Sequence, residues 1–599
     1  MALPGITSVT ILDGSLGIIP DDATSVCVKL GACSLGTANQ IYSFNSVQDV
    51  KDTLGTGKLV DALAVSLDIA GGPVYAIKMD TSVAGTTSPI QKNLVTTPTA
   101  SDGNMTVSGS PLDDYNVIVN IVRAGKVGTA PYPTIQYSLD GGQSYSEEIA
   151  VPISGVYVVP STGLTLTFTN STNGFFIGDS FKFTTVAATW NNTNLSTALT
   201  ALLADTGRNY GFIHIIGVAD STIATTVASY MNAAQTNEKY IHADIEARDM
   251  DFIAKLETAA QTFPMTFAGG ETLNIQVSTD GGATFPVTKT FTFPAVAYAA
   301  IGNLVTALNV QSFTGGLFSV YASTTPATGL TLATLSNKGR VQLKVAASTG
   351  IGGALIQYTL GQTAKGEEED TWMNSLIADF IGFSSTRVSV FGGYADIYTS
   401  ASKRYVRRSG AWLQSAREAL VPISEDLGKV ARGPLPNILT PNLPLGIYGI
   451  YHDEDAKPGL DVARFSTLRR FRGLPGFYIT NARNMASPGS DYTFMQFRRV
   501  IDRVTELLNI ISKQYINSEV RINSDGTIYE EDAVAIENRV FNYIFSAVKD
   551  NISGLQVQVD RTVNIQSTMQ LKIKVSVRPF GYFKFISLTT GFAPVQPVV

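Results

Sequence analysis

Two stretches late in the sequence carry apolar side chains at helical spacing. In residues 491–516 they recur at steps of three and four, at Phe494, Phe497, Ile501, Val504, Leu508, Ile511 and Tyr515. This spacing places them on one face of an α-helix of about six turns. In residues 530–551 they follow at steps of four, at Ile536, Val540, Ile544 and Val548. The pattern therefore predicts two amphipathic helices.

Strict alternation of apolar and polar residues follows these helices. Residues 555–560 read LQVQVD and residues 571–577 read LKIKVSV, which is the two-residue period of β-strands. In the second run Leu571, Ile573, Val575 and Val577 face one way, whereas Lys572, Lys574, Ser576 and Arg578 face the other. Residues 585–599, FISLTTGFAPVQPVV, are predicted to be extended because no helical period is present.

Helical and strand patterns alternate in the rest of the chain. Leu59, Leu63 and Leu67 lie on one helix face, Gly71-Gly72-Pro73 ends that helix, and residues 74–77 form an apolar strand. The order of helix then strand returns in residues 195–220 and 367–399. This order predicts an α/β core that is interrupted twice.

An internal duplication occupies the two interruptions. YSLDGGQSYSEEIAVP (137–152) resembles VSTDGGATFPVTKTF (277–291), and STGLTLTFTNS (161–171) resembles ATGLTLATLSN (327–337). The Asp-Gly-Gly tripeptide is typical of a tight turn between two strands. A helical insert at residues 295–310 would account for the changed spacing. We predict two related β-sandwich-like modules.

Composition and charge exclude several classes of protein. Charged residues make up 15% of the 599 residues, against the roughly 25% usual in globular proteins, and the net charge is −6. An acidic chain is a poor candidate for binding nucleic acid through phosphates. No uncharged apolar run reaches the roughly 18 residues of a spanning helix, and the first residues lack a secretory pattern. We expect no nucleic-acid binding and no membrane insertion.

No catalytic, metal or cofactor site can be assembled from the sequence. Cys27 and Cys33 fit small reduced core residues, although the sequence does not say whether they are ever oxidised. His214, His242 and His452 lie too far apart for the short spacings of zinc motifs. We therefore expect neither metal nor cofactor, and no enzymatic activity.

Three polar runs imitate binding motifs. Residues 55–59, GTGKL, lack the first glycine and the hydroxyl residue of a phosphate-binding loop. Residues 367–370 are acidic and fit a solvated helix start, and HDED at 452–455 fits a turn before Pro458. We interpret these runs as structural.

Basic residues gather with aromatic residues at 403–408, KRYVRR, and at 469–472, RRFR. Such segments can bind nucleic acid, but in an acidic chain we favour a charged protein–protein contact face. Arg498, Arg499 and Arg503 on the first helix, with Lys572, Lys574 and Arg578 on the last strand, are predicted to belong to such a face.

Four segments in order resemble the contractile-tail sheath proteins of myophages and related contractile injection systems. They are residues 54–79, with a helix, a glycine pair and a strand; residues 403–440; residues 465–511, with the Arg-Arg helix; and the alternating strands with the extended end. The resemblance covers residues 1–95, 190–264 and 365–599.

The resemblance implies an α+β multidomain fold, with a discontinuous α/β sheath core, two inserted β-sandwich-like modules and extended terminal β-arms. The expected parts are an N-terminal arm at 1–20, core at 21–95, a module at 96–188, core at 189–264, a second module at 265–364, the C-terminal sheath core at 365–584 and a C-terminal arm at 585–599.

The resemblance also implies a structural function. Subunits would form stacked hexameric rings around an inner tail tube protein, with baseplate and tail terminator proteins at the two ends. Contraction would drive the tube through the host envelope. The particle would be a virion tail assembled in the host cytoplasm. Arms would add strands to neighbouring subunits, which places Thr7, Val9, Ile11, Phe585, Ile586 and Leu588 at subunit contacts.

Two other classes compete with this interpretation. A polysaccharide-active or carbohydrate-binding tail enzyme or adhesin could also carry repeated β modules. A tail-tube protein could be rich in β structure, but the long helix at 491–516 argues against a purely β tube. The host, the role of the modules, the helical parameters and the extended or contracted state do not follow from the sequence.

Overall fold

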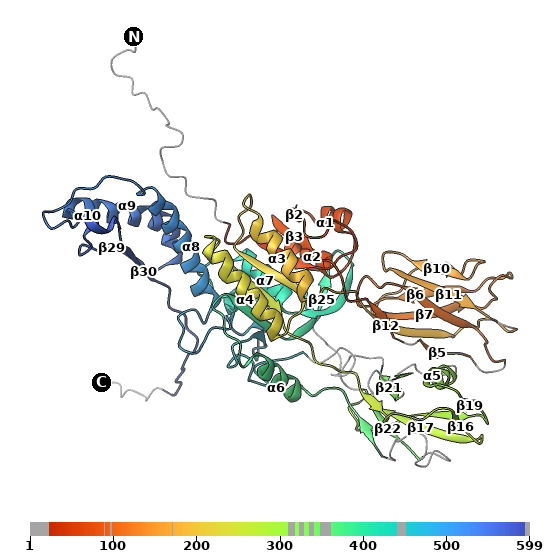
Figure 1. The fold of residues 1–599 in the computed structure, drawn as a ribbon. Helices are drawn as coiled ribbons and strands as arrows, with labels where there is room; N and C mark the ends of the chain where they lie inside the picture. Colours follow the sequence, from red (N-terminus) through yellow and green to blue (C-terminus); the bar gives the residue numbers. More distant parts are fainter. Residues whose placement is uncertain are drawn as a thin grey trace, which may run out of the picture.

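A computed structural model gives the arrangement of most of the chain. It describes residues 23–88, 90–95, 99–170, 172–278, 280–309, 318–322, 329–334, 341–347, 361–439 and 451–592. A central sheet covered by helices lies between two β regions at one end and a helical lobe at the other (Figure 1). The expected strand at residues 6–12, with Thr7, Val9 and Ile11, lies outside the described residues.

The central sheet has the order β2-β3-β1-β13-β14-β24-β27-β28. Its strands are β1 (Cys27–Gly31), β2 (Ile41–Phe44), β3 (Val74–Lys78), β13 (Phe212–Val218), β14 (His242–Glu246), β24 (Val388–Gly392), β27 (Ser466–Arg469) and β28 (Tyr478–Ile479). The inner strands run parallel, and β2 and β28 are antiparallel edge strands. Every residue of β1, β14 and β24 is buried, as expected where helices cover both faces.

Helices cover the two faces of this sheet. One hydrophobic cluster joins the sheet to α3 (Asn192–Ala204), α4 (Ser221–Thr236) and α6 (Glu369–Phe380). A second cluster joins the opposite face to α1 (Val47–Leu54), α2 (Lys58–Ala70) and α7 (Ala411–Leu420). A hairpin of β25 (Tyr394–Thr399) and β26 (Arg404–Ser409) precedes α7. The predicted mixed α/β architecture is confirmed.

The chain leaves the sheet twice, after β3 and after β14. Because these strands are parallel within one sheet, both departures lie at the carboxyl edge. The first β region contains β4 (Thr86–Thr87), β5 (Gln91–Asn93), β6 (Asn104–Gly109), β7 (Asn116–Arg123), β8 (Thr134–Ser138), β9 (Ile149–Ala150), β10 (Val156–Val159), β11 (Leu164–Thr169) and β12 (Ser180–Val186). Its entry and exit meet where Val83 and Thr189 exchange backbone hydrogen bonds of 3.0 and 2.9 Å.

The second β region contains β15 (Lys255–Glu257), β16 (Met265–Thr266), β17 (Glu271–Ser278), β18 (Val287–Phe293), β19 (Ala297–Tyr298), α5 (Ile301–Asn309), β20 (Phe318–Ala322), β21 (Leu330–Thr334), β22 (Gln342–Val345) and β23 (Thr363–Ala364). Helix α5 lies inside the helical insert expected at 295–310.

The predicted starts of the modules, 96 and 265, fall too late. β4 and β5 already pair with β12, and β15 pairs with β21.

The two β regions share both topology and turn geometry. Each contains an antiparallel three-stranded sheet in equivalent order, β10-β11-β6 in the first and β20-β21-β15 in the second. In the first DGG turn Asp140 accepts hydrogen bonds from the hydroxyls of Ser138 (2.7 Å) and Ser144; in the second Asp280 accepts them from Ser278 and Thr284 (both 2.6 Å). The glycines of both turns have φ between 77° and 97°, which explains their identity.

The helical lobe contains α8 (Met495–Lys513), α9 (Glu530–Val548), β29 (Gly554–Val559), α10 (Ile565–Thr568) and β30 (Ile573–Arg578). Short 3₁₀ turns occur at Val430–Arg432 and Lys549–Asn551. Val504, Leu507, Val540 and Ile544 form the core between α8 and α9. Among the described helices, none is both long and apolar enough to span a membrane.

Candidate functional site: hairpin, exposed segment and buried charges

The β29–β30 hairpin is a two-stranded sheet on the surface of the lobe. Its strands pair from Gly554 with Arg578 to Val559 with Ile573. Within the described residues, neither strand has a partner on its outer edge. Val575 and Val577 pack toward the lobe core, whereas Lys574 and Arg578 are exposed, as the alternation predicted. Lys572 is also exposed. A two-stranded sheet with free edges is a natural site for added strands.

An exposed apolar segment follows the hairpin. We define the exposed segment as residues 585–592, which form neither helix nor strand in this structure. Phe585 is 96% exposed and Leu588 is 87% exposed, and Ile586 and Phe592 are also uncovered. Exposing so many large apolar side chains in one short segment is unfavourable in water. The predicted arm residues Phe585, Ile586 and Leu588 therefore lie where a partner could cover them.

The three arginines of α8 do not form the predicted contact face. Arg498, Arg499 and Arg503 are 8%, 3% and 4% exposed. Arg499 Nε lies 3.2 Å from Glu418 Oε1 of α7, and Arg503 Nη1 lies 2.7 Å from Glu506 Oε2. Because the start of α8 packs into the core, these charges are satisfied inside the chain. The contact face is corrected to Lys572, Lys574 and Arg578, which remain a proposal.

Asp502 forms the centre of the buried pairs on α8. It accepts hydrogen bonds of 2.9 Å from both Nη atoms of Arg387, and it also pairs with Arg498. Arg387 is 1% exposed and donates a further hydrogen bond to the carbonyl of Ile241. These contacts join the lobe to the central sheet, because Arg387 directly precedes β24.

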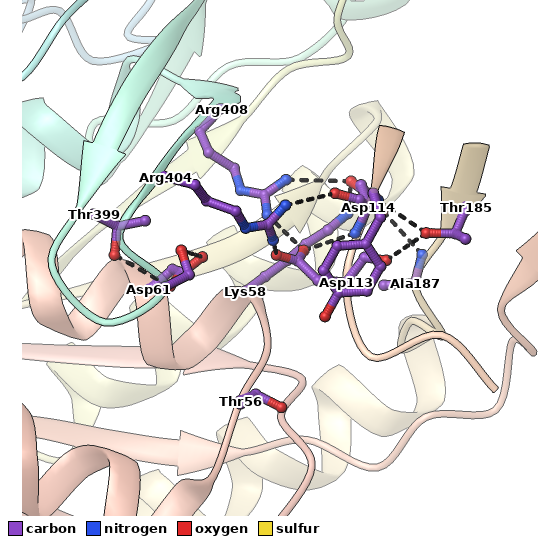
Figure 2. Close-up of polar contacts among 12 residues, drawn as sticks. Thr56, Lys58, Asp61, Asp113, Asp114, Thr185, Ala187, Thr399, Arg404 and Arg408 are labelled. Carbon is purple, nitrogen blue, oxygen red and sulfur yellow. Dashed lines mark hydrogen bonds and ion pairs between the residues drawn. The ribbon is translucent and has the colours of Figure 1, made fainter. Parts of the chain in front are cut away.

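The arginines of the basic segment 403–408 also lie inward, contrary to prediction, whereas Lys403 is exposed. The guanidinium groups of Arg404 and Arg408 point toward Asp113 and Asp114, in the turn before β7 (Figure 2). Arg408 lies 2.5 Å from Asp113, Arg404 also pairs with Asp113, and Lys58 lies 2.7 Å from Asp114. We call these five residues the arginine junction. It holds the first β region against the core.

The neighbouring Arg407 binds the segment that leads into the second β region. Its Nη2 donates a 2.9 Å hydrogen bond to Asp249, just before that region. Arg248 and Glu367 then form a two-pronged ion pair of 2.6 and 2.7 Å across its entry and exit. The sequence predicts that Glu367 lies in a solvated acidic run. In the structure, its ion pair with Arg248 instead ties the start of the second β region to its end. Strand β26 thus supports both β regions.

Asp61 lies beside the arginine junction and is buried. It accepts hydrogen bonds from the hydroxyls of Thr399 (3.1 Å) and Ser402 (3.2 Å) (Figure 2). Burial and the nearby Asp113 raise the pKa of Asp61 to about 6, although Arg404 and Arg408 oppose this effect. The fold therefore favours the neutral carboxyl. Its stabilising contribution is complete below the ordinary value of 3.8 and is lost as the pH rises through about 6.

Replacing Asp61 with Asn is expected to stabilise the protein at pH 7.5. The carboxylate is then ionised at a cost, and the amide removes that charge while it can still accept a hydrogen bond. The gain in unfolding free energy should be at most about 3 kcal/mol and should shrink at pH 5. Denaturant melts at both pH values test this. Asp68→Asn, on the exposed face of the same helix, is the control, and a loss of stability at pH 7.5 would contradict the expectation.

His452 lies buried between two carboxylates rather than in an exposed turn. Its Nδ1 lies 2.8 Å from Glu369 Oε1 and its Nε2 lies 2.9 Å from Glu454 Oε2. These two acceptors raise the pKa of His452 against the opposing effect of burial. The imidazolium thus joins the start of α6 to the loop before β27. Its contribution is complete below the ordinary value of 6.5 and is lost as the pH rises through the higher value in the fold.

We expect the protein to lose stability as the pH rises above 6.5, in part through His452. Deprotonation leaves either the buried Glu454 or the partly buried Glu369 without its donor. His452→Gln should lower the unfolding free energy at pH 6 by about 1–3 kcal/mol, and the difference should narrow as the pH rises. Thermal melts of both proteins from pH 6 to pH 9 provide the measurement. Parallel pH profiles would show that His452 does not titrate in this range.

Ser415, His214 and Glu246 lie in an order that resembles a nucleophile, base and acid. Ser415 Oγ lies 3.0 Å from His214 Nδ1, and His214 Nε2 lies 3.3 Å from Glu246. Lys29 donates a 2.8 Å hydrogen bond to the same Ser415 oxygen. Ser415 and His214 have no exposed surface, so a substrate cannot reach the hydroxyl in this structure. Burial and Lys29 lower the pKa of His214 to about 4, which keeps the imidazole neutral.

Two hollows in the described part of the chain add no catalytic set. A cavity of about 300 Å³ lies between the first β region and the carboxyl edge of the sheet, and its charged lining includes the arginine junction residues Lys58, Asp114 and Arg408. A groove of about 1240 Å³ lies on the lobe, between the end of α8, α9 and β30. Within the described residues, no group of three or more His, Cys, Asp or Glu side chains could hold a metal ion.

Comparisons with known proteins cover nearly the whole chain. The family model described as DUF2586, N-terminal domain, matches residues 3–268 and 264–483. No curated protein matches the sequence.

Among solved structures, the chain is similar to a sheath tail protein from Desulfitobacterium hafniense. The two are 10% identical, the match covers 96% of this chain and 100% of that one, and the TM-score is 0.39. The anti-feeding prophage baseplate structure matches at 9% identity, 99% coverage of both chains and a TM-score of 0.43. The contracted sheath complex of an extracellular contractile injection system matches at 9% identity, with 99% and 98% coverage and a TM-score of 0.42.

Proposed function

The chain belongs to the family described as DUF2586, N-terminal domain, and we propose that it is the structural subunit of a contractile tail sheath. Subunits would stack as hexameric rings around an inner tail tube protein, between baseplate and tail terminator proteins. Contraction would drive the tube through the host envelope. We place the assembled protein in a virion tail built in the host cytoplasm, and we assign it no enzymatic role.

The observation that carries the proposal is the exposed segment together with the hairpin. One short stretch leaves Phe585, Ile586 and Leu588 uncovered, while β29 and β30 have free outer edges within the described residues. Each feature supplies what the other lacks, because a segment added to a strand edge gains backbone hydrogen bonds and covers its apolar side chains. A donor and an acceptor on every copy allow open-ended assembly.

The buried charges support a rigid subunit. Arg387, Asp502 and Arg499 join the lobe to the sheet core, so that force applied at the hairpin would reach the whole core. We propose that the two β regions are inserted modules. Both leave the sheet at its carboxyl edge, away from the lobe, so they would face outward from the assembly (Figure 1). Lys572, Lys574 and Arg578 would contact acidic groups of a neighbouring subunit or of the tube.

Negative-stain electron microscopy of the purified full chain tests this function. Long hollow cylinders, formed by the protein alone or around tube protein, are the expected result. Compact particles that cleave polysaccharide would instead support the enzyme class. Compact particles without activity at every concentration and ionic strength would also defeat the proposal.

A further inference from the structure

The segment between the hairpin and the exposed segment is attached to the core by two side chains. After Arg578 the chain returns to the core, where the Tyr582 hydroxyl donates a hydrogen bond to the carbonyl of Ser424. The Tyr582 ring lies 5.6 Å from the ring of Phe497 on α8. Tyr582 is therefore fixed to the loop after α7 and to the first turn of α8.

Lys584 makes the second attachment. Its Nζ pairs with Asp426, donates a 2.6 Å hydrogen bond to Asn481 Oδ1, and lies 4.5 Å from the centre of the Phe494 ring. The side chain of Lys584 is 28% exposed and that of Asp426 is 12% exposed, so the pair is partly shielded from water although the Lys584 residue as a whole is exposed. Asp426 is itself held by the backbone N–H of Gly428 and the side-chain amide of Gln496.

A sharp change in exposure occurs at this point. Tyr582 and Lys584 are held against the core, whereas Phe583 between them is 94% exposed and Phe585 directly after them is 96% exposed. The attachment therefore ends one residue before the exposed segment begins. The core, rather than the end of β30, determines where that segment leaves the molecule.

We infer that Tyr582 and Lys584 are positioning residues for assembly, which present the exposed segment to a neighbouring copy from a fixed point on the core. We call these two residues and their contacts the clip. This inference rests on the proposed function, in which the exposed segment is the donor. The clip itself does not touch the neighbour, and it acts by fixing the origin of the donor.

The length of the free link gives the expected effect. With the clip in place, Phe585 directly follows the anchored Lys584, so the link is one residue step long; without the clip, seven steps separate Phe585 from Arg578 at the end of β30. The effective concentration of a tethered group falls roughly as the −3/2 power of the link length, which is on the order of tenfold here. The critical concentration for assembly should rise by a similar factor.

The experiment compares the parent with Tyr582→Ala/Lys584→Ala in the full chain. Pelleting over a concentration series gives the critical concentration, and thermal melts check the fold. Lys457→Ala is the matched control, because it removes a surface ion pair to Asp370 elsewhere in the molecule.

Each outcome decides a different claim. The positioning role of the clip is supported if the parent assembles, the double variant needs about ten times more protein to assemble, and the Lys457→Ala control behaves like the parent. A parent and a double variant with equal critical concentrations overturn the clip and leave the sheath function standing. A parent that never assembles overturns the sheath function and the clip with it. If the double variant melts early, Lys584→Met, which keeps the packing on Phe494, must still show a raised critical concentration.

Discussion

Removal of residues 586–599 is expected to abolish polymers while leaving a folded monomer. Ile586, Leu588 and Phe592 are exposed, so their loss removes no packing from the described core. If they cover a neighbour's hairpin, every link of that kind in the assembly is lost together. A net backbone hydrogen bond contributes only about 1 kcal/mol, but several bonds and the apolar contacts are repeated at each subunit.

Two measurements on the truncated chain test this prediction. The melting temperature should stay within a few degrees of the parent, and sedimentation should find only monomers at concentrations where the parent pellets. A chain of full length with Ser587→Ala and Thr589→Ala is the control, because it keeps the apolar side chains. Cylinders of normal length from the truncated chain would show that the segment is not the donor.

Replacing Asp113 with Ala is expected to destabilise the fold by about 3–5 kcal/mol. Asp113 is 3% exposed and pairs with both Arg404 and Arg408. Truncation leaves two buried guanidinium groups with only Asp114 and Asp61 to balance them. The cost arises from the charges left unpaired rather than from the loss of attraction alone.

Calorimetric or denaturant unfolding measures this effect. Asp370→Ala is a suitable control, since it breaks an exposed ion pair with Lys457 and should change the stability far less. The loss of stability caused by Asp113→Asn should lie between those of Asp113→Ala and Asp370→Ala, because Asn removes the charge but keeps the size and hydrogen-bonding capacity. An Asp113→Ala protein as stable as the control would mean that water reaches the arginine junction freely.

Periodic signals in the sequence were sufficient for the parts of the fold that have one apolar face. The four-residue spacing of Ile536, Val540 and Ile544 located α9, and the alternation at 571–577 located β30 and its exposed Lys574. These elements lie between a core and water, so hydrophobic pattern and burial agree.

The same reasoning failed for α8, because its first half has no water-facing side. The sequence predicts that Arg498 and Arg499 lie on a charged contact face, but Asp502 and Glu418 meet them inside the protein, and Asp502 in turn pairs with Arg387. Glu418 and Arg387 lie on other elements, so the spacing of apolar residues along α8 does not reveal them. Buried ion pairs depend on which distant segments meet, and hydrophobic periodicity does not contain that information.

The sequence indicates the arginine junction and the clip less clearly than it indicates the helices and strands. Asp113 and Asp114 form an acidic doublet in a stretch of low charge, which could have marked them as partners for the basic residues at 403–408. The contact nevertheless joins positions 295 residues apart. Tyr582 and Lys584 are ordinary surface types in the sequence, and only the return of the chain to Ser424 and Asp426 identifies them.

The closed entry and exit of the first β region bear on the order in which the chain folds. Pairing β1 with β13 joins Cys27 to Phe212, and the loop-closure entropy of so long a connection grows with its length. The backbone bonds between Val83 and Thr189 bring the two ends of the excursion together. If the first β region folds as soon as it leaves the ribosome, the connection that must close becomes much shorter. The first β region would then hold the two ends of the connection together, and the pairing of β1 with β13 would follow its folding.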